Sequence, residues 1–135
     1  MELKLKDLIN AERIFATLNM TRGFSSVVAY RISKTVKDVS KELKEYEAQR
    51  IKLCEEYAKK DDEGKPIIIP DPETGKSSYD ISAEDLIKVN NELNNLQEET
   101  VDINIKKVTL EDIDKAGLAP LELELIEFML DLEEE

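Results

Sequence analysis

The chain of 135 residues contains no histidine, no tryptophan and a single cysteine, and only 5% of its residues are aromatic. Without histidine, and with Cys54 as its only thiol, the sequence offers no zinc ligand set and no Ser–His or Cys–His pair for nucleophilic catalysis. Cys54 lies in an apolar pattern, where it is more readily explained as a small buried residue than as a nucleophile. We therefore predict that the protein is not an enzyme, with no catalytic residue, no metal site and no cofactor.

Long apolar runs are also missing. No stretch approaches the roughly 18–20 apolar residues that a membrane-spanning helix needs, and the N-terminal MELKLKDLIN lacks the apolar core of a signal peptide. We therefore expect an intracellular protein that has no membrane partner. The chain length favours one domain over residues 1–135.

Positive charge is scarce in the second half of the chain. Residues 1–60 hold 13 Lys and Arg against 9 Asp and Glu, whereas residues 61–135 hold 6 against 22, and the whole chain has a net charge of −12. Such an acidic half repels nucleic acid and attracts basic surfaces, including those that normally hold nucleic acid. We expect no direct nucleic-acid binding and a protein partner with a basic surface.

The longest pattern in the sequence predicts a helix from about residue 25 to residue 60. Apolar residues recur there at alternating spacings of three and four, as in a coiled-coil seam. A second helix, introduced by the capping pattern at Ser82, carries a matching seam and predicts an antiparallel hairpin with the C-terminal half of the first. Arg50, the only charged residue in the long seam, is expected to reach an acid such as Glu92 across the hairpin. A role in setting the register is the alternative.

The second helix is too short to cover the N-terminal half of the long seam. Short amphipathic helices of the same chain, one at Leu8–Leu18 and one begun by Pro120, are candidates for that cover. We therefore expect a homo-oligomer, taken as a dimer, because exposed apolar stripes tend to be buried against partners. The uncovered seam residues are Ala29, Ile32, Val36, Val39 and Leu43.

Shorter elements flank the hairpin. Apolar residues between Leu8 and Leu18 predict one short helix, and Pro120 begins another near the C-terminus. Alternating residues in 1–5 and in 101–105 predict two strands that pair as a ribbon. The expected fold is therefore mostly α with minor β (α+β): an antiparallel long-helix hairpin, short flanking helices and a two-stranded β-ribbon.

The segment 61–80 is predicted to be a loop inserted into the hairpin, with room for a β-hairpin. Its sequence PDPETGKS imitates a phosphate-binding loop, but Pro70 stands where the first glycine belongs and its neighbours are acidic, so we reject a nucleotide-hydrolysing site. Long insertions are either disordered or functional, and three consecutive isoleucines argue against simple disorder. The candidate contact residues are Ile67, Ile68 and Ile69.

Two charged sets are candidates for binding. The first is an acidic face on the expected C-terminal helix, followed by the acidic tail 133–135. Its residues are Glu122, Glu124, Glu127 and Asp131. The second is a candidate anion site on the long helix, opposite the seam. Its residues are Arg31, Lys34, Lys37, Lys41 and Lys44. For each set the simpler alternative is a solvated surface, and docking of the acidic half on the basic set is another.

The segments LKLKDLINA, VVAYRISKTVKDVSKELKEYEAQRIKLCEEY and ETVDINIKKVTLEDIDKAGLAPLELELIEFML together resemble a family of short uncharacterised proteins of phages and prophages of Gram-positive bacteria. The resemblance implies a viral gene product, located in the host cytoplasm, and it transfers no active site. Three functions follow as hypotheses. The first is an acidic inhibitor of a host defence or nucleic-acid-handling protein, the second a structural or assembly protein of the virion, and the third a protein that sequesters a small ligand such as a nucleotide.

Overall fold

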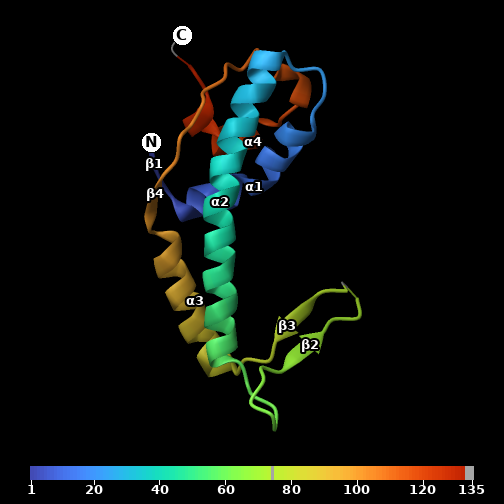
Figure 1. The fold of residues 1–135 in the computed structure, drawn as a ribbon, viewed down its shortest axis with the longest axis vertical. Helices are drawn as coiled ribbons and strands as arrows, with labels where there is room; N and C mark the ends of the chain where they lie inside the picture. Colours follow the sequence, from blue (N-terminus) through green and yellow to red (C-terminus); the bar gives the residue numbers. More distant parts are fainter. Residues whose placement is uncertain (74, 133–135) are drawn as a thin grey trace. The chain divides into compact units, whose positions relative to one another are not determined.

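The computed structural model describes residues 1–73 and 75–132 (Figure 1). They are mostly α with a minor β component, as predicted. The chain divides into two compact units, one made of residues 1–44 and 98 onward and the other of residues 45–97. The helix α2, Ser26–Tyr57, continues from the first unit into the second. No helix in the described ranges is long and apolar enough to cross a membrane.

The predicted ribbon opens the first unit. Strand β1, Glu2–Lys4, pairs antiparallel with β4, Thr100–Asp102, and Leu3 lies opposite Val101. Helix α1, Leu5–Met20, follows β1 directly, and its first free backbone N–H, at Leu5, donates to the carbonyl of Glu99. The apolar stripe of α1 is buried along its whole length. Its residues are Leu5, Leu8, Ala11, Ile14, Phe15 and Leu18.

In the first unit, α2 buries a stripe that is rotated from the predicted seam. Ser25 caps the helix by accepting a hydrogen bond from the backbone N–H of Val28 (3.3 Å). Val28, Ile32, Thr35 and Val39 are buried, whereas Ala29 is exposed. Thr35 fits among apolar residues because its hydroxyl accepts a hydrogen bond from the backbone N–H of Lys106 (3.0 Å). A buried hydroxyl with a partner does not incur the desolvation penalty of an unpaired one.

The C-terminal segment forms short pieces of helix in place of the longer predicted helix. Thr109 and Asp112 cap each other's backbone N–H groups, a 3₁₀ turn η1 covers Asp114–Ala116, and Gly117 ends it in the left-handed conformation (φ 61°). Helix α4 is only Pro120–Leu125, with Pro120 in the first turn as predicted. A second 3₁₀ turn, η2, covers Glu127–Met129.

The expected helix breaks after Leu125 because the chain returns to pair with an earlier segment. The backbone N–H of Val108 donates to the carbonyl of Met129 (3.0 Å), and that of Asp131 donates to the carbonyl of Val108 (2.8 Å). A 3₁₀ turn places residues three apart on one side, so Ile126 and Met129 are both buried completely.

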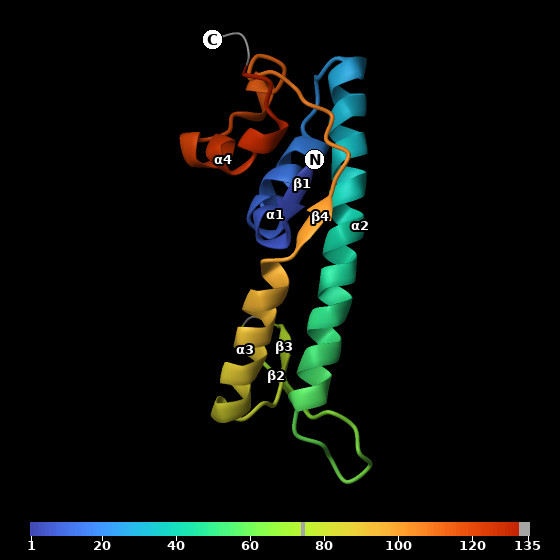
Figure 2. The same ribbon diagram turned by 90° about the vertical axis from the view of Figure 1, so that its left-hand side faces the viewer.

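Within the first unit, α1 lies between the N-terminal part of α2 and the C-terminal segment (Figure 2). On one side, Phe15 and Ala16 of α1 line the same cleft as Val36, Val39 and Leu43 of α2. On the other side, the rings of Phe15 and Phe128 lie 6.0 Å apart between centroids. Phe15 takes part in both contacts, so α1 links α2 to the C-terminal segment.

The second unit contains the predicted antiparallel helical hairpin. Helix α3, Ala83–Gln97, is capped by Ser82, whose hydroxyl accepts a hydrogen bond from the backbone N–H of Asp85 (3.2 Å). Gln97, at the end of α3, donates to the hydroxyl of Tyr46 (2.8 Å), while Tyr57, later on α2, lies near Glu92 and Asp85, which come earlier on α3. This reversed order of partners confirms the antiparallel pairing, and Cys54, Ala58 and Val89 are buried.

The segment between these helices forms a small hairpin. Strand β2, Ile68–Pro70, pairs antiparallel with β3, Ser77–Tyr79. Its base is closed by backbone hydrogen bonds from Lys59 to Asp80, from Ile67 to Lys59 and from Asp80 to Ile67. The described residues of the segment 61–80 thus include a β-hairpin, which the sequence left room for.

Candidate interaction surfaces

The described residues contain no cluster that could hold a metal ion. No group of three or more His, Cys, Asp or Glu side chains in the part of the chain that the structure describes is arranged for that purpose. Cys54 is buried, as predicted for a small packing residue. The features that remain are surfaces, on which charge and exposed apolar residues are unevenly distributed.

The predicted acidic face is divided by the break after Leu125. Glu122 points back to its own helix end, where its Oε1 accepts a hydrogen bond from the backbone N–H of Ala119 (2.9 Å). Asp131 is half-buried, and its backbone is held in the bridge to Val108. Only Glu124 and Glu127 of the four are exposed. The acidic tail 133–135 lies outside the described residues.

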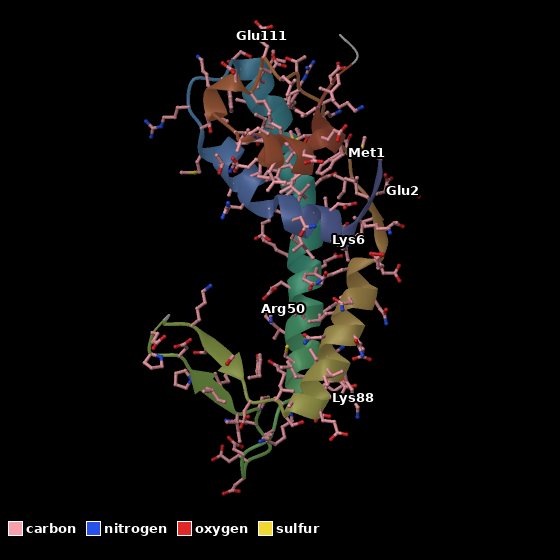
Figure 3. All side chains as sticks on the ribbon, turned by 180° about the vertical axis from the view of Figure 1, so that it is seen from behind. Met1, Glu2, Lys6, Arg50, Lys88 and Glu111 are labelled. Carbon is pink, nitrogen blue, oxygen red and sulfur yellow. The ribbon has the colours of Figure 1, made fainter. Side chains whose placement is uncertain are left out.

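The structure adds two carboxylates to Glu124 and Glu127. Glu111 and Asp114 are exposed on the segment before α4, and Glu111 projects at the edge of the first unit in Figure 3. Asp114 and Leu123 line one cavity, so this segment adjoins α4. We call Glu111, Asp114, Glu124 and Glu127 the acidic surface.

The carboxylates of the acidic surface have no ion-pair partner in residues 1–73 and 75–132. Lys115 is the only cation in residues 108–132, and its ammonium donates to the carbonyl of Gly23 (2.8 Å). Two large apolar residues of the same segments are also exposed, Leu110 by 44% and Leu121 by 66%. The segments that carry these carboxylates therefore expose leucines as well.

The predicted anion site lies on one exposed face of α2. All five of its cations are exposed, and none forms an ion pair within residues 1–73 and 75–132, so the acidic half does not dock on them there. Helical spacing adds Val27 and Tyr30 to the same face, and each is 60% exposed. We call this the basic face. It comprises Val27, Tyr30, Arg31, Lys34, Lys37, Lys41 and Lys44.

The basic face begins in an open groove of about 470 Å³. It is lined by Ser26, Val27, Tyr30, Arg31 and Lys106. The ammonium of Lys34 lies 5.5 Å from the centre of the Tyr30 ring, which is within the range of a cation–π contact. Asp38 also follows the helical spacing of this face, but its carboxylate accepts a hydrogen bond from the backbone N–H of Asn104 (3.1 Å).

The predicted oligomer seam is largely covered within one chain. Ile32 and Val39 are buried, Val36 and Leu43 are half-buried beside Phe15, and Ala29 is exposed because Val28 takes the inward position. The short amphipathic helix predicted at Leu8–Leu18 was a candidate for this cover within the chain, and α1 takes that place. The sequence did not show that the segment after β4 would contribute. Oligomerisation stays a prediction, but it now requires another surface.

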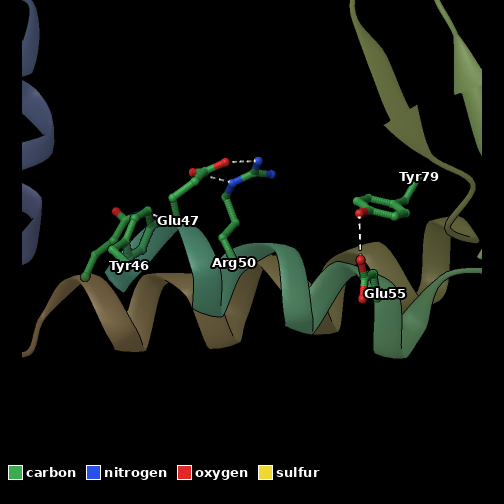
Figure 4. Close-up of polar contacts among 6 residues, drawn as sticks. Tyr46, Glu47, Arg50, Glu55 and Tyr79 are labelled. Atoms are coloured by element: carbon green, nitrogen blue, oxygen red, sulfur yellow. Dashed lines mark hydrogen bonds and ion pairs between the residues drawn. The ribbon is translucent and has the colours of Figure 1, made fainter. Parts of the chain in front are cut away.

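The three isoleucines of the inserted segment are only partly packed. Ile67 is half-buried at the base of the β2–β3 hairpin, whereas Ile68 is 55% exposed and Ile69 is 47% exposed. Tyr79 on β3 donates its hydroxyl hydrogen to Glu55 (3.1 Å) and thereby ties the hairpin to α2 within the second unit (Figure 4). Burial, together with that hydrogen bond, raises the pKa of Tyr79.

Arg50 does not reach Glu92 across the hairpin. Its Nε donates to Glu47 one turn earlier on α2 (2.9 Å), and its Nη2 bonds the other carboxylate oxygen (Figure 4). This two-point hydrogen bond lowers the pKa of Glu47 and raises that of Arg50. A neighbour at i−3 on the same helix needs less ordering than an acid on another helix, which explains the choice of partner.

A separate ion-pair cluster fastens the ribbon of the first unit. Glu98 accepts hydrogen bonds from the ammonium groups of Lys6 (2.8 Å) and Lys4 (3.1 Å), more than 90 residues away in the chain. These bonds lower the pKa of Glu98, and the bond to Glu98 raises the pKa of Lys6. We interpret the cluster as structural, because Lys4 and Lys6 both pair with Glu98.

Several residues of these surfaces were not predicted from the sequence. Val27 and Tyr30 share the helical spacing of the basic set, so a helical projection of α2 could have included them. Lys106, Glu111 and Asp114 gave no such signal, because only tertiary packing brings their segment to α2 and α4.

Comparison with protein-family models, with curated proteins and with solved structures finds no match to this chain.

Proposed function

We propose that the protein is a non-enzymatic phage accessory protein that acts in the host cytoplasm by binding a host protein. In this proposal it is an acidic inhibitor of a defence or nucleic-acid-handling protein, and the acidic surface makes the contact. The observation that carries the proposal is that Glu111, Asp114, Glu124 and Glu127 are exposed without any ion pair to a described residue. The phage origin rests on the sequence resemblance alone.

The physical basis is competition for a basic surface. Surfaces that hold nucleic acid are lined by Lys and Arg, and carboxylates can occupy them in place of phosphates. Complementary charge also steers the encounter, so association is fast and falls as salt is added. The exposed Leu110 and Leu121 would supply the apolar contact that salt does not weaken.

The test compares two variants of equal charge change. The first replaces the acidic surface (Glu111→Gln, Asp114→Asn, Glu124→Gln, Glu127→Gln). The control replaces four exposed acids of the second unit (Glu45→Gln, Glu56→Gln, Asp62→Asn, Glu92→Gln). Host proteins captured by the wild type are identified by mass spectrometry, and the affinity of the purified partner is then measured against salt.

We expect the acidic-surface variant to lose the partner and its inhibition, while the control retains both. Neutralising four carboxylates in contact with cations should weaken binding by at least about tenfold. An affinity that is unchanged between low and high salt would refute the electrostatic mechanism. Equal binding by the two variants would show that the acidic surface is only solvated.

A second candidate function, assembly of the virion, is favoured by one observation. The first unit carries two surfaces of opposite charge on different elements, which is the arrangement that subunits of an assembly use. An assembly protein should co-purify with particles or their intermediates, whereas an inhibitor should be found with its host target and not with particles.

A further inference from the structure

We propose that the basic face of one copy of this protein binds the acidic surface of a second copy, so that the chains associate head to tail. The inference does not depend on the proposed function, although it uses the same carboxylates. Two surfaces of the first unit carry it, one on α2 and one on the segments around α4.

A single small anion would not cover the basic face. From Val27 to Lys44 it extends about 26 Å along the helix, which is longer than a single phosphate group can neutralise. Val27 and Tyr30, each 60% exposed, lie in its groove beside Arg31 and Lys106. A small anion would satisfy the charges and leave this apolar area in water, at a cost of roughly 25 cal/mol for each Å². The face therefore fits a protein surface that offers acids and apolar side chains together.

The acidic surface of the same chain has that composition. Glu111 and Asp114 flank a segment that exposes Leu110, and Glu124 and Glu127 lie on either side of the end of α4, which exposes Leu121. The two surfaces are complementary in charge, and each has uncovered apolar residues to bury. Neither uses its charges in ion pairs among the described residues.

The placement of the two surfaces determines the geometry. In the first unit α1 lies between α2 and α4 (Figure 2), so Glu124 and Glu127 stay open in a copy that binds a neighbour through its basic face. Asp114 lies nearer to the start of α2, because the adjacent Lys115 bonds the carbonyl of Gly23. Such heterologous contacts build rings or open chains, unlike the two-fold dimer that a shared seam would produce. Each copy then uses its basic face in one contact and its acidic surface in the next.

The net charge of −12 sets the conditions of the contact. Two such chains repel at low ionic strength, but at 0.15 M salt the screening length is only about 8 Å, which removes most of the long-range repulsion and spares the charges in contact. Association should therefore be strongest near physiological salt and should decrease by 1 M.

Two complementary variants test the proposal by sedimentation. The basic-face variant carries Arg31→Gln, Lys34→Gln, Lys37→Gln and Lys41→Gln, and the acidic-surface variant is the one described above. The control neutralises four exposed lysines of the second unit (Lys52→Gln, Lys60→Gln, Lys65→Gln, Lys88→Gln). Glutamine has nearly the helix propensity of lysine, and circular dichroism and thermal melting establish that each variant folds.

We expect the wild type and the control to associate, and each surface variant alone to remain at 15.4 kDa, with association weakened at least about tenfold. An equimolar mixture of the two surface variants should form a species of twice the monomer mass and nothing larger, because each contributes one intact surface. The basic-face variant should still bind a host target of the acidic surface, which separates this proposal from the previous one.

Three results would overturn the inference. The wild type could remain monomeric up to about 1 mM at 0.15 M salt, or the mixture of variants could stay monomeric although the wild type associates. In the third, nucleotides such as ADP raise the melting temperature of the wild type but not of the basic-face variant, while the wild type stays monomeric. That result would assign the face to a small anionic ligand.

Discussion

Replacing Val39 by aspartate tests the buried stripe of α2 in the first unit. Val39 is 1% exposed and lines a cleft with Phe15 of α1. Removing a fully buried valine from the core costs about 2 kcal/mol. Burial of the aspartate side chain in its place raises the pKa of the introduced carboxyl. A rise of about three units costs about 4 kcal/mol more at neutral pH.

The sum, about 6 kcal/mol, is comparable with the whole stability of a small domain. We therefore expect Val39→Asp to unfold the first unit or nearly so at pH 7, measured by urea denaturation followed by circular dichroism. Ser33→Asp, on an exposed position of the same helix, is the matched control and should change the free energy of unfolding by well under 1 kcal/mol. Hydrogen exchange would show whether the loss is confined to residues 1–44 and 98 onward.

The destabilisation by Val39→Asp should also depend on pH. The folded-state pKa of the introduced carboxyl lies above its unfolded value of about 3.9, so its penalty is complete above the folded pKa and disappears as the pH falls to the unfolded one. Val39→Asn carries no such titration. The stability difference between the Asp and Asn variants should therefore shrink between pH 7 and pH 4. A constant difference, or a Val39→Asp variant as stable as Ser33→Asp, would refute the burial argument.

Two further predictions concern the ribbon and the inserted segment. Lys6 and Lys4 hold the pKa of Glu98 below its ordinary value, so this acid stabilises the fold above its unfolded pKa of about 4.3, and the contribution is lost as the pH falls through the lowered value. Glu98→Gln should thus lower the melting temperature at pH 7 more than Glu99→Gln does, and equal losses by the two variants at pH 7 would contradict the ion-pair cluster. Replacing residues 68–79 by a short Gly/Ser linker should preserve helicity and cooperative melting, because Ile68 and Ile69 are largely exposed. Loss of helicity and of cooperative melting in this variant would show instead that these isoleucines belong to the core.

Local signals in the sequence determined the elements and many of their ends. Ser25, Ser82 and the pair Thr109–Asp112 provide side-chain oxygens for the first backbone N–H groups of helical turns, and those partners lie within three residues. Gly117 adopts the left-handed conformation that a side chain disfavours. The ribbon was predictable because alternation in two segments defines their inner faces. The same holds for the hairpin of α2 and α3, whose apolar positions match in reverse order.

Only the tertiary structure decided which way these elements face and where their charges remain free. Val28 and not Ala29 is buried because α1 and the segment after β4 cover α2 from one side, and spacing alone does not locate that cover. The expected C-terminal helix ends at Leu125 because pairing with Val108 competes with helical hydrogen bonds. Glu122 is used in a cap, while Glu111 and Asp114 join the acidic surface through packing between segments. Burial and pairing are non-local, so the sequence showed the sign of the charge in each half and the fold selected the residues that present it.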